Sequence, residues 1–241
     1  MSTITGLRRG DVGYAMLWTP DVARAAAFYH DLLGWRLSPG GSAQGRQVEG
    51  VTPPFGVWGG QDRYTLFLCY AVDDVTEAIH RVRAAGGRAE ESRREPYGLI
   101  ADCEDDQGLP FVVYEDTGRG RATERPRHGE LAYITIGFPD VEAAKAFYGP
   151  VLGWRFTPGR VENGWNVRND DGEVRPMVGF WGGRERAAAV PLYAVDDLAA
   201  AVAKARELGG TATDPQPRPF GSMAECTDDQ GCPFYLARLD G

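Results

Sequence analysis

Histidine is scarce in this sequence. Only three of the 241 residues are histidines. His30 and His80 lie in expected helices, and His128 lies in an expected linker. Imidazole is the most common general base and a frequent metal ligand, so neither kind of site has a ready donor here. No GxSxG motif is present, and the glycine pairs at 59–60 and 182–183 lack the helix and lysine of a phosphate-binding loop.

Cysteine usage and hydropathy point to the cell interior. None of the four cysteines lies in a CxxC pair or shares a module with a matched histidine, so free thiols are expected. The N-terminal residues have no apolar core for export, and no run approaches the roughly 20 apolar residues of a membrane-spanning helix. We therefore expect a cytoplasmic protein without a membrane partner.

Positive charge is also limited. The chain has 26 Lys and Arg against 34 Asp and Glu, a net charge of −8, and no long basic run. This balance argues against nucleic acid and favours a neutral or cationic small molecule as partner. The contents of 43% hydrophobic and 25% charged residues are typical of a globular protein.

One sequence unit is present twice. Residues 20–36, PDVARAAAFYHDLLGWR, return as residues 139–155, PDVEAAKAFYGPVLGWR, with eleven of seventeen positions identical. An aspartate suited to N-capping opens each copy, apolar residues follow at helical spacing, and Gly34 or Gly153 suits the helix end. Both copies predict an amphipathic helix that packs on a sheet.

Each copy contains two modules of the same order. A strand is expected at 12–19 before the first helix, and another at 64–72 before a helix at 75–85, each followed by short strands. YAVDD recurs at 193–197, and ADCEDDQGLPF from Ala101 recurs as AECTDDQGCPF from Ala224. We predict an α+β fold of paired βαβββ modules, with domains at 1–118 and 129–241 joined by a polar linker at 119–128.

The paired modules, with AxxFYxxxLGW on the first helix and DDQGxPF at the last turn, resemble the vicinal oxygen chelate superfamily, which includes glyoxalase I, extradiol dioxygenases and bleomycin-resistance proteins. The resemblance implies that each repeat forms a U-shaped mixed sheet around a cleft, with helices outside. It also implies that the repeats pair as an internal pseudo-dimer, and it leaves a further homodimer open.

The metal enzymes of this superfamily use His, Gln or Glu ligands at three positions of each cleft. The resemblance places these positions seven residues before each capping aspartate and four residues after the turn glycine. They hold Tyr14, Phe67 and Val112 in the first repeat and Tyr133, Val190 and Tyr235 in the second. Because these side chains rarely or never bind metal, we expect no metal and no other cofactor.

Strand alternation and the resemblance together suggest which residues face the clefts. The first set is Tyr14, Met16, Trp18, Trp58, Phe67, Cys69, Val112 and Tyr114, and the second is Tyr133, Thr135, Trp181, Val190, Leu192 and Tyr235. Aromatic walls suit a bulky planar ligand, although the same residues could simply fill the concave face as core. No residue is assigned a catalytic role.

Three functions remain open. The leading hypothesis is a metal-free protein that sequesters or carries a bulky, partly aromatic natural product, as in bleomycin-type self-protection and antibiotic resistance. The alternative is a metal-independent isomerase, cyclase or lyase of a secondary-metabolite pathway that uses cleft tyrosines. A sensor or scaffold with unused clefts is the third.

The matched positions generate a prediction about metal content. Purified protein should hold no stoichiometric divalent ion, and a chelator should leave its melting temperature unchanged, because the matched side chains are poor ligands. Elemental analysis and thermal unfolding with and without chelator measure both. About one Ni, Zn, Fe or Mn per repeat, with chelator-sensitive unfolding, would contradict it.

Overall fold

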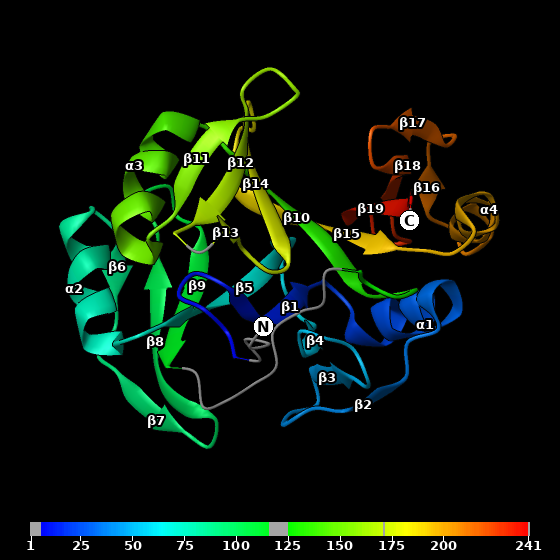
Figure 1. The fold of residues 1–241 in the computed structure, drawn as a ribbon. Helices are drawn as coiled ribbons and strands as arrows, with labels where there is room; N and C mark the ends of the chain where they lie inside the picture. Colours follow the sequence, from blue (N-terminus) through cyan, green and yellow to red (C-terminus); the bar gives the residue numbers. More distant parts are fainter. Residues whose placement is uncertain (1–5, 116–124, 171, 241) are drawn as a thin grey trace. The chain divides into compact units, whose positions relative to one another are not determined.

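An aspartate caps each helix in the computed structural model, which describes residues 6–115, 125–170 and 172–240 (Figure 1). Each capping carboxylate accepts a hydrogen bond from a backbone N–H of the first turn, as predicted. Gly34 and Gly153, with φ of 70° and 73°, end the first and third helices in the left-handed conformation. The helices are α1 (Val22–Leu33), α2 (Val75–Ala84), α3 (Val141–Leu152) and α4 (Leu198–Glu207), capped by Asp21, Asp74, Asp140 and Asp197.

The first repeat contributes one mixed sheet. Its strand order is β2-β3-β4-β1-β5-β9-β8-β6, with β7 paired to β8, and β5 runs parallel to β9. The short, arginine-containing β6 and β7 were not predicted, because two or three residues cannot show an alternation. The strands are β1 (Val12–Trp18), β2 (Leu37–Pro39), β3 (Gly45–Val48), β4 (Phe55–Trp58), β5 (Thr65–Val72), β6 (Arg88–Ala89), β7 (Arg93–Glu95), β8 (Gly98–Glu104) and β9 (Pro110–Glu115).

The second repeat has the same order, β11-β12-β14-β10-β15-β19-β18-β16, with β13 paired to β12 and β17 to β18. The additional strand β13 lies in the part of this repeat that is longer than its counterpart. The strands are β10 (Leu131–Phe138), β11 (Arg155–Pro158), β12 (Gly164–Asn169), β13 (Gly172–Glu173), β14 (Met177–Gly182), β15 (Ala188–Ala194), β16 (Thr211–Ala212), β17 (Gln216–Arg218), β18 (Gly221–Thr227) and β19 (Pro233–Leu239). The predicted α+β class is confirmed.

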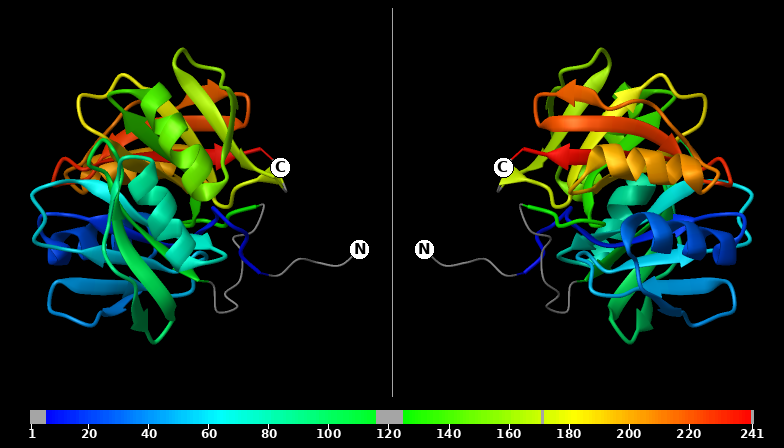
Figure 2. Two further views of the ribbon diagram at one scale, coloured as in Figure 1. Left: turned by 90° about the vertical axis from the view of Figure 1, so that its left-hand side faces the viewer. Right: turned by 90° about the vertical axis from the view of Figure 1, so that its right-hand side faces the viewer.

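Packing groups the modules differently from their order in the sequence. Unit 1 contains the described parts of residues 1–15, 67–123 and 135–189, and unit 2 those of 16–66, 124–134 and 190–241. Each unit thus combines a module of one repeat with a module of the other. Helices α2 and α3 lie side by side in unit 1, as do α1 and α4 in unit 2 (Figure 2).

The predicted domains at 1–118 and 129–241 follow the sequence repeat, and this division stays a prediction. Most of the predicted linker, residues 119–124, lies outside the described residues.

In unit 1, the two most strongly repeated motifs bind each other. The hydroxyl of Tyr148, on α3, donates a 3.0 Å hydrogen bond to Oδ2 of Asp105, the first residue of the DDQG turn. Oδ1 of Asp105 accepts the backbone N–H groups of Gln107 and Leu109 and so fixes the turn. The side-chain amide of Gln107 in turn pairs with both backbone groups of the α3 cap, Asp140. The helix motif of one repeat is therefore bonded to the turn motif of the other.

Unit 2 repeats this arrangement with the partners exchanged. Tyr29, on α1, donates to Oδ2 of Asp228 at 3.4 Å, and the side chain of Gln230 bonds both backbone groups of Asp21. Arg24 adds an ion pair of 2.9 Å to Asp229. In both units, therefore, the helix motif of one repeat binds the DDQG turn of the other repeat and joins their modules.

The Tyr and Trp of the helix motif also stack on each other. The ring centroids lie 5.5 Å apart for Tyr148 and Trp154, and 5.1 Å apart for Tyr29 and Trp35. The indole N–H of Trp154 donates to the carbonyl of Gly10, and that of Trp35 to the carbonyl of Gly129. Each indole therefore finds its partner in the opposite repeat, which satisfies its one polar group inside an aromatic core.

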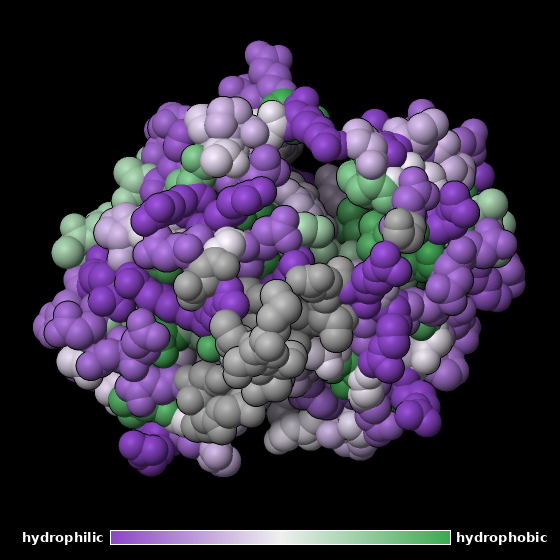
Figure 3. Space-filling model, in the orientation of Figure 1, coloured by the Kyte–Doolittle hydropathy of each residue, from purple (hydrophilic) through white to green (hydrophobic). Residues whose placement is uncertain are grey.

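Hydrophilic side chains cover most of the face shown in Figure 3, and hydrophobic ones form smaller patches. None of the helices that the structure describes is long and apolar enough to cross a membrane.

The Tyr148–Asp105 bond predicts a stability difference between two buried tyrosines of unit 1. Tyr148→Phe should lower the free energy of unfolding by about 1.5–3 kcal/mol, because it removes a hydrogen bond to a buried carboxylate. Tyr70→Phe is the matched control, since the hydroxyl of Tyr70 is buried and bonds to none of the described residues. It should cost less than about 0.5 kcal/mol. Urea unfolding measures both, and equal losses would contradict the role assigned to Asp105.

Candidate functional site

The strands that open each repeat alternate as predicted. On β1, Tyr14, Met16 and Trp18 are half-buried, whereas Ala15 and Leu17 are fully buried. On β10, Tyr133 and Thr135 are half-buried and their neighbours are buried. The predicted site residues of both strands therefore lie on the more accessible side.

Four predicted residues of the first repeat come together in unit 1. Phe67, Cys69, Val112 and Tyr114 belong to one apolar group, which we call cluster 1 and which also contains Leu7, Ala71 and Ile100. The parallel register places Cys69 beside Val112 and Ala71 beside Tyr114. The prediction that these four share a face is consistent with this cluster.

Tyr114 fills part of cluster 1 itself. Its side chain is 3% exposed, and its hydroxyl lies 1.4 Å from where a Cβ on Gly13 would be. Any side chain at position 13 would therefore displace the ring. In this repeat the protein's own tyrosine takes up room that a ligand could otherwise use.

Three predicted residues of the second repeat come together in unit 2. Tyr133, Leu192 and Tyr235 belong to cluster 2, which also contains Met223 and three alanines, Ala132, Ala194 and Ala237. By the sequence repeat, Ala237 takes the place of Tyr114 and Ala132 that of Gly13. Two alanines thus replace the glycine and the tyrosine of the first repeat, and Tyr133, Met223 and Tyr235 are all half-buried. Cluster 2 therefore has the smaller side chain where Tyr114 stands in cluster 1.

The remaining predicted residues lie outside both clusters. Val190 is 1% exposed and packs as core. Trp58 is half-buried beside Gly45, whereas Trp181 is 38% exposed. Met16, Trp18 and Trp58 lie in unit 2 and Thr135 and Trp181 in unit 1.

Sequence analysis missed Ile100 and Met223. Ile100 pairs with Tyr114 across β8 and β9, and Met223 pairs with Ala237 across β18 and β19. Both hairpins close at the DDQG turn. Counting back from that turn would have aligned these residues with the cluster positions.

Burial controls the protonation of the tyrosine and cysteine side chains around the clusters. It raises the pKa of Tyr133 to about 12, so this phenol is protonated at neutral pH and can donate a hydrogen bond. Burial likewise raises the pKa of Cys103, Cys226 and Cys232 to about 12. Cys69 is the more accessible thiol, being half-buried in cluster 1.

The positions matched to metal ligands do not fit a metal ion. They supply three phenols, one phenyl ring and two valines, and a divalent ion prefers imidazole, carboxylate or thiolate. Among the residues that the structure describes, no group of three or more His, Cys, Asp or Glu side chains could hold one elsewhere.

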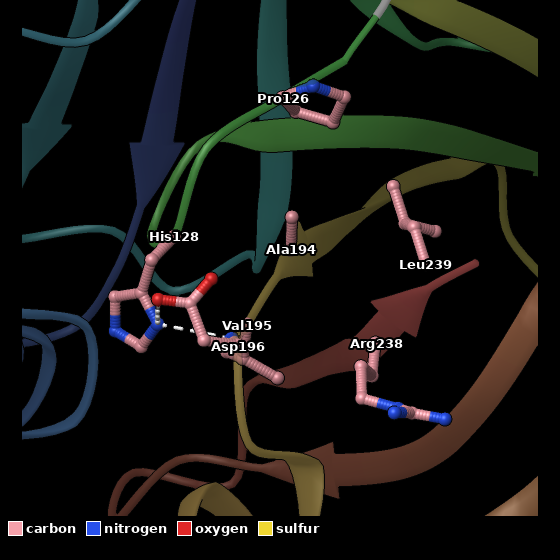
Figure 4. A pocket seen from close by; sticks show the side chains of 7 residues that line it. All are labelled: Pro126, His128, Ala194, Val195, Asp196, Arg238 and Leu239. Carbon is pink, nitrogen blue, oxygen red and sulfur yellow. Dashed lines mark hydrogen bonds and ion pairs between the residues drawn. The ribbon is translucent and has the colours of Figure 1, made fainter. Parts of the chain in front are cut away.

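An open pocket of about 280 Å³ in unit 2 shares Ala194 with cluster 2 (Figure 4). Nδ1 of His128 accepts a 3.3 Å hydrogen bond from the backbone N–H of Asp196. The same Nδ1 lies 3.8 Å from Oδ2 of Asp196. Arg238 pairs with Asp240 at 3.8 Å. Because Arg238 already faces an acidic partner, we consider the pocket a weaker ligand site than cluster 2. It is lined by Pro126, His128, Ala194, Val195, Asp196, Arg238 and Leu239.

Two family models match the chain in succession. Residues 11–113 match the Glyoxalase/Bleomycin resistance protein/Dioxygenase superfamily, and residues 133–237 match a Glyoxalase-like domain. The two matches coincide with the two sequence repeats.

Two curated relatives are similar over nearly the full length. The anthracycline biosynthesis protein DnrV of Streptomyces peucetius is 28% identical, and DauV of Streptomyces sp. (strain C5), of the same description, is 27% identical. Each alignment covers 92% of this chain and 91% of the relative.

Solved structures share the fold at low identity. The Mn(II)-bound glyoxalase from Novosphingobium aromaticivorans superposes with a TM-score of 0.74 at 17% identity, over 98% of this chain and 84% of that one. The 2,3-dioxygenase LapB from Pseudomonas sp. KL28 gives 0.70 at 14% identity, over 99% and 94%. With both repeats matched by family models and the fold shared throughout, the chain belongs to the vicinal oxygen chelate superfamily as a tandem two-domain member.

Proposed function

We propose that the chain binds a bulky, partly aromatic natural product and does so without a metal ion. Cluster 2 carries this proposal. Tyr133, Met223 and Tyr235 are half-buried around a floor of alanines. Half-buried apolar side chains around small residues offer flat contact area, and the two phenols can fix orientation through hydrogen bonds.

The substitutions at the ligand positions support binding over metal chemistry. Tyr133 and Tyr235 add contact area at two of the three matched positions of the second repeat, where the metal enzymes of the superfamily need a donor. The relatives described as anthracycline biosynthesis proteins support an oxygen-rich polycyclic aromatic compound as the ligand class. Sequestration or transport of such a compound is the function that these observations favour.

A metal-independent isomerase, cyclase or lyase is the second candidate, and Tyr133 favours it. A phenol with a pKa of about 12 remains protonated at neutral pH, so it could polarise a ligand carbonyl by donating a hydrogen bond without transferring its proton. Mass spectrometry of the recovered ligand separates the two candidates. Unaltered compound supports binding, and a change in mass or connectivity supports catalysis.

Aromatic stacking on Trp181 and Trp58 should contribute to affinity. Trp181→Ala and Trp58→Ala should each raise the dissociation constant for an anthracycline about two- to twelvefold, measured by calorimetric titration. This range corresponds to the roughly 0.5–1.5 kcal/mol of a good aromatic pair. Trp165→Ala is the control, because Trp165 pairs with the core residue Phe180 and lies under the Lys145 ammonium group. If the site is elsewhere, all three variants will bind like the parent protein.

Thiol labelling tests the first repeat separately. At pH 8 one thiol should react rapidly with an aromatic disulfide reagent and Cys69→Ser should abolish that phase, because the other three are buried with a pKa of about 12. Bound anthracycline should slow the reaction several-fold if it covers cluster 1. A rapid phase that survives in Cys69→Ser, or that saturating ligand leaves unchanged, argues against a ligand on this face.

A further inference from the structure

The side chain of Arg184 occupies the place that Gly137 leaves open on β10. A Cβ at Gly137 would lie 2.5 Å from Cδ, 2.7 Å from Nε and 2.8 Å from Cγ of Arg184. All of these atoms belong to unit 1. The aliphatic part of Arg184 therefore fills the space beside position 137. A side chain larger than that of glycine would clash with it.

The guanidinium group of Arg184 has no acidic partner among the described residues. Its Nε is buried and donates to none of them, and none of their carboxylates forms an ion pair with it. The backbone N–H of Arg184 is anchored to the carbonyl of Phe138 at 3.3 Å. Guanidinium remains charged at all physiological pH values, and a buried N–H without an acceptor is costly. An acceptor supplied from outside the chain would remove that cost.

An exposed aromatic ring lies three residues before Arg184 in the chain, and a threonine lies two residues before Gly137. Trp181, 38% exposed, stands over Gly183, with ring atoms 3.6 and 3.8 Å from where its Cβ would be. The indole comes from the end of β14 and the guanidinium from the connection between β14 and β15 (Figure 1). Thr135 is half-buried two residues before Gly137 on the same side of β10.

The first repeat lacks this charge. By the sequence repeat, Trp18 stands at the position of Gly137 and Gln61 at that of Arg184. Gln61 bonds back to the carbonyl of Gly59 within its own turn. The first repeat thus has Trp18 and the neutral Gln61 at the two positions where the second repeat has Gly137 and the charged Arg184.

We propose that Arg184 determines the ligand specificity of the second repeat by binding an anionic oxygen, a carboxylate or an ionised phenol, on a planar ring that stacks against Trp181. This inference rests on the proposed function for its aromatic ligand class, and it concerns a place in unit 1 that is separate from cluster 2. It replaces, for this repeat, the cationic ligand favoured by the net charge of −8, because a guanidinium in contact outweighs a screened surface field.

Two ring compounds that differ in one group test the proposal. Anthraquinone-2-carboxylate and neutral 2-(hydroxymethyl)anthraquinone are titrated into the full chain by calorimetry. The parent protein should bind the carboxylate about tenfold more tightly, and the preference should shrink at high salt. Arg184→Gln, which installs the residue of the first repeat, should remove the preference by weakening binding of the carboxylate about tenfold, a much larger loss than for the neutral compound.

Three further variants separate specificity from general effects. Arg186→Gln changes the same charge at an exposed position two residues away and should keep the preference. Arg184→Lys should keep part of it, and Gly137→Ala should reduce it by displacing the arginine stem. Circular dichroism checks that every variant is folded.

The outcomes distinguish this inference from the proposed function. Equal binding of both compounds by parent and Arg184→Gln overturns the role of Arg184 and leaves aromatic binding in place. If Arg186→Gln also loses the preference for the carboxylate, the preference arises from net charge, and the inference is overturned. Failure of the parent to bind either compound counts against the proposed function itself.

Discussion

The hydrogen bond from a helix tyrosine to a buried turn aspartate holds the modules of this protein together. Tyr148 bonds Asp105 in unit 1, and Tyr29 bonds Asp228 in unit 2. Burial raises the pKa of both carboxyl groups. Backbone N–H donors counteract that effect at both, together with the hydroxyl of Tyr148 at Asp105 and the thiol of Cys232 at Asp228. Since a buried carboxylate is tolerated only with its hydrogen bonds made, each turn requires the helix of the other repeat. The compact units therefore combine modules that are distant in the chain.

Internal duplication leaves each repeat free to diverge on its accessible side while the joining contacts stay the same. The caps, the Tyr–Trp stacks and the turn glutamines are equivalent in both units. The accessible faces differ: Tyr114 covers Gly13 in one repeat, and alanines occupy both places in the other. The two faces are thus suited to different ligands, and the second face, which has the smaller side chain at the position of Tyr114, is the better candidate.

Superfamily membership establishes the fold and leaves the chemistry to the residues that face outward, because one fold supports many reactions. The manganese-bound glyoxalase shares the backbone course at 17% identity, and the ligand positions here hold no metal donors. Similarity to proteins described by anthracycline biosynthesis, together with aromatic and thioether side chains on cluster 2, favours recognition of a polycyclic compound.

The sequence by itself determined the local structure. Capping aspartates, terminal glycines and strand alternation depend on neighbours in the chain, so all four helices and the half-buried series on β1 could be predicted. The duplication also predicted which positions correspond, and the resemblance to the superfamily indicated which of them would have to hold metal donors. Only the tertiary structure decided which modules pack together, because the Tyr–Asp and Trp–Gly bonds join residues more than forty positions apart. It also decided that Tyr114 fills the first face and that Arg184 fills the gap at Gly137, since both depend on side chains that cross from one strand or turn to another.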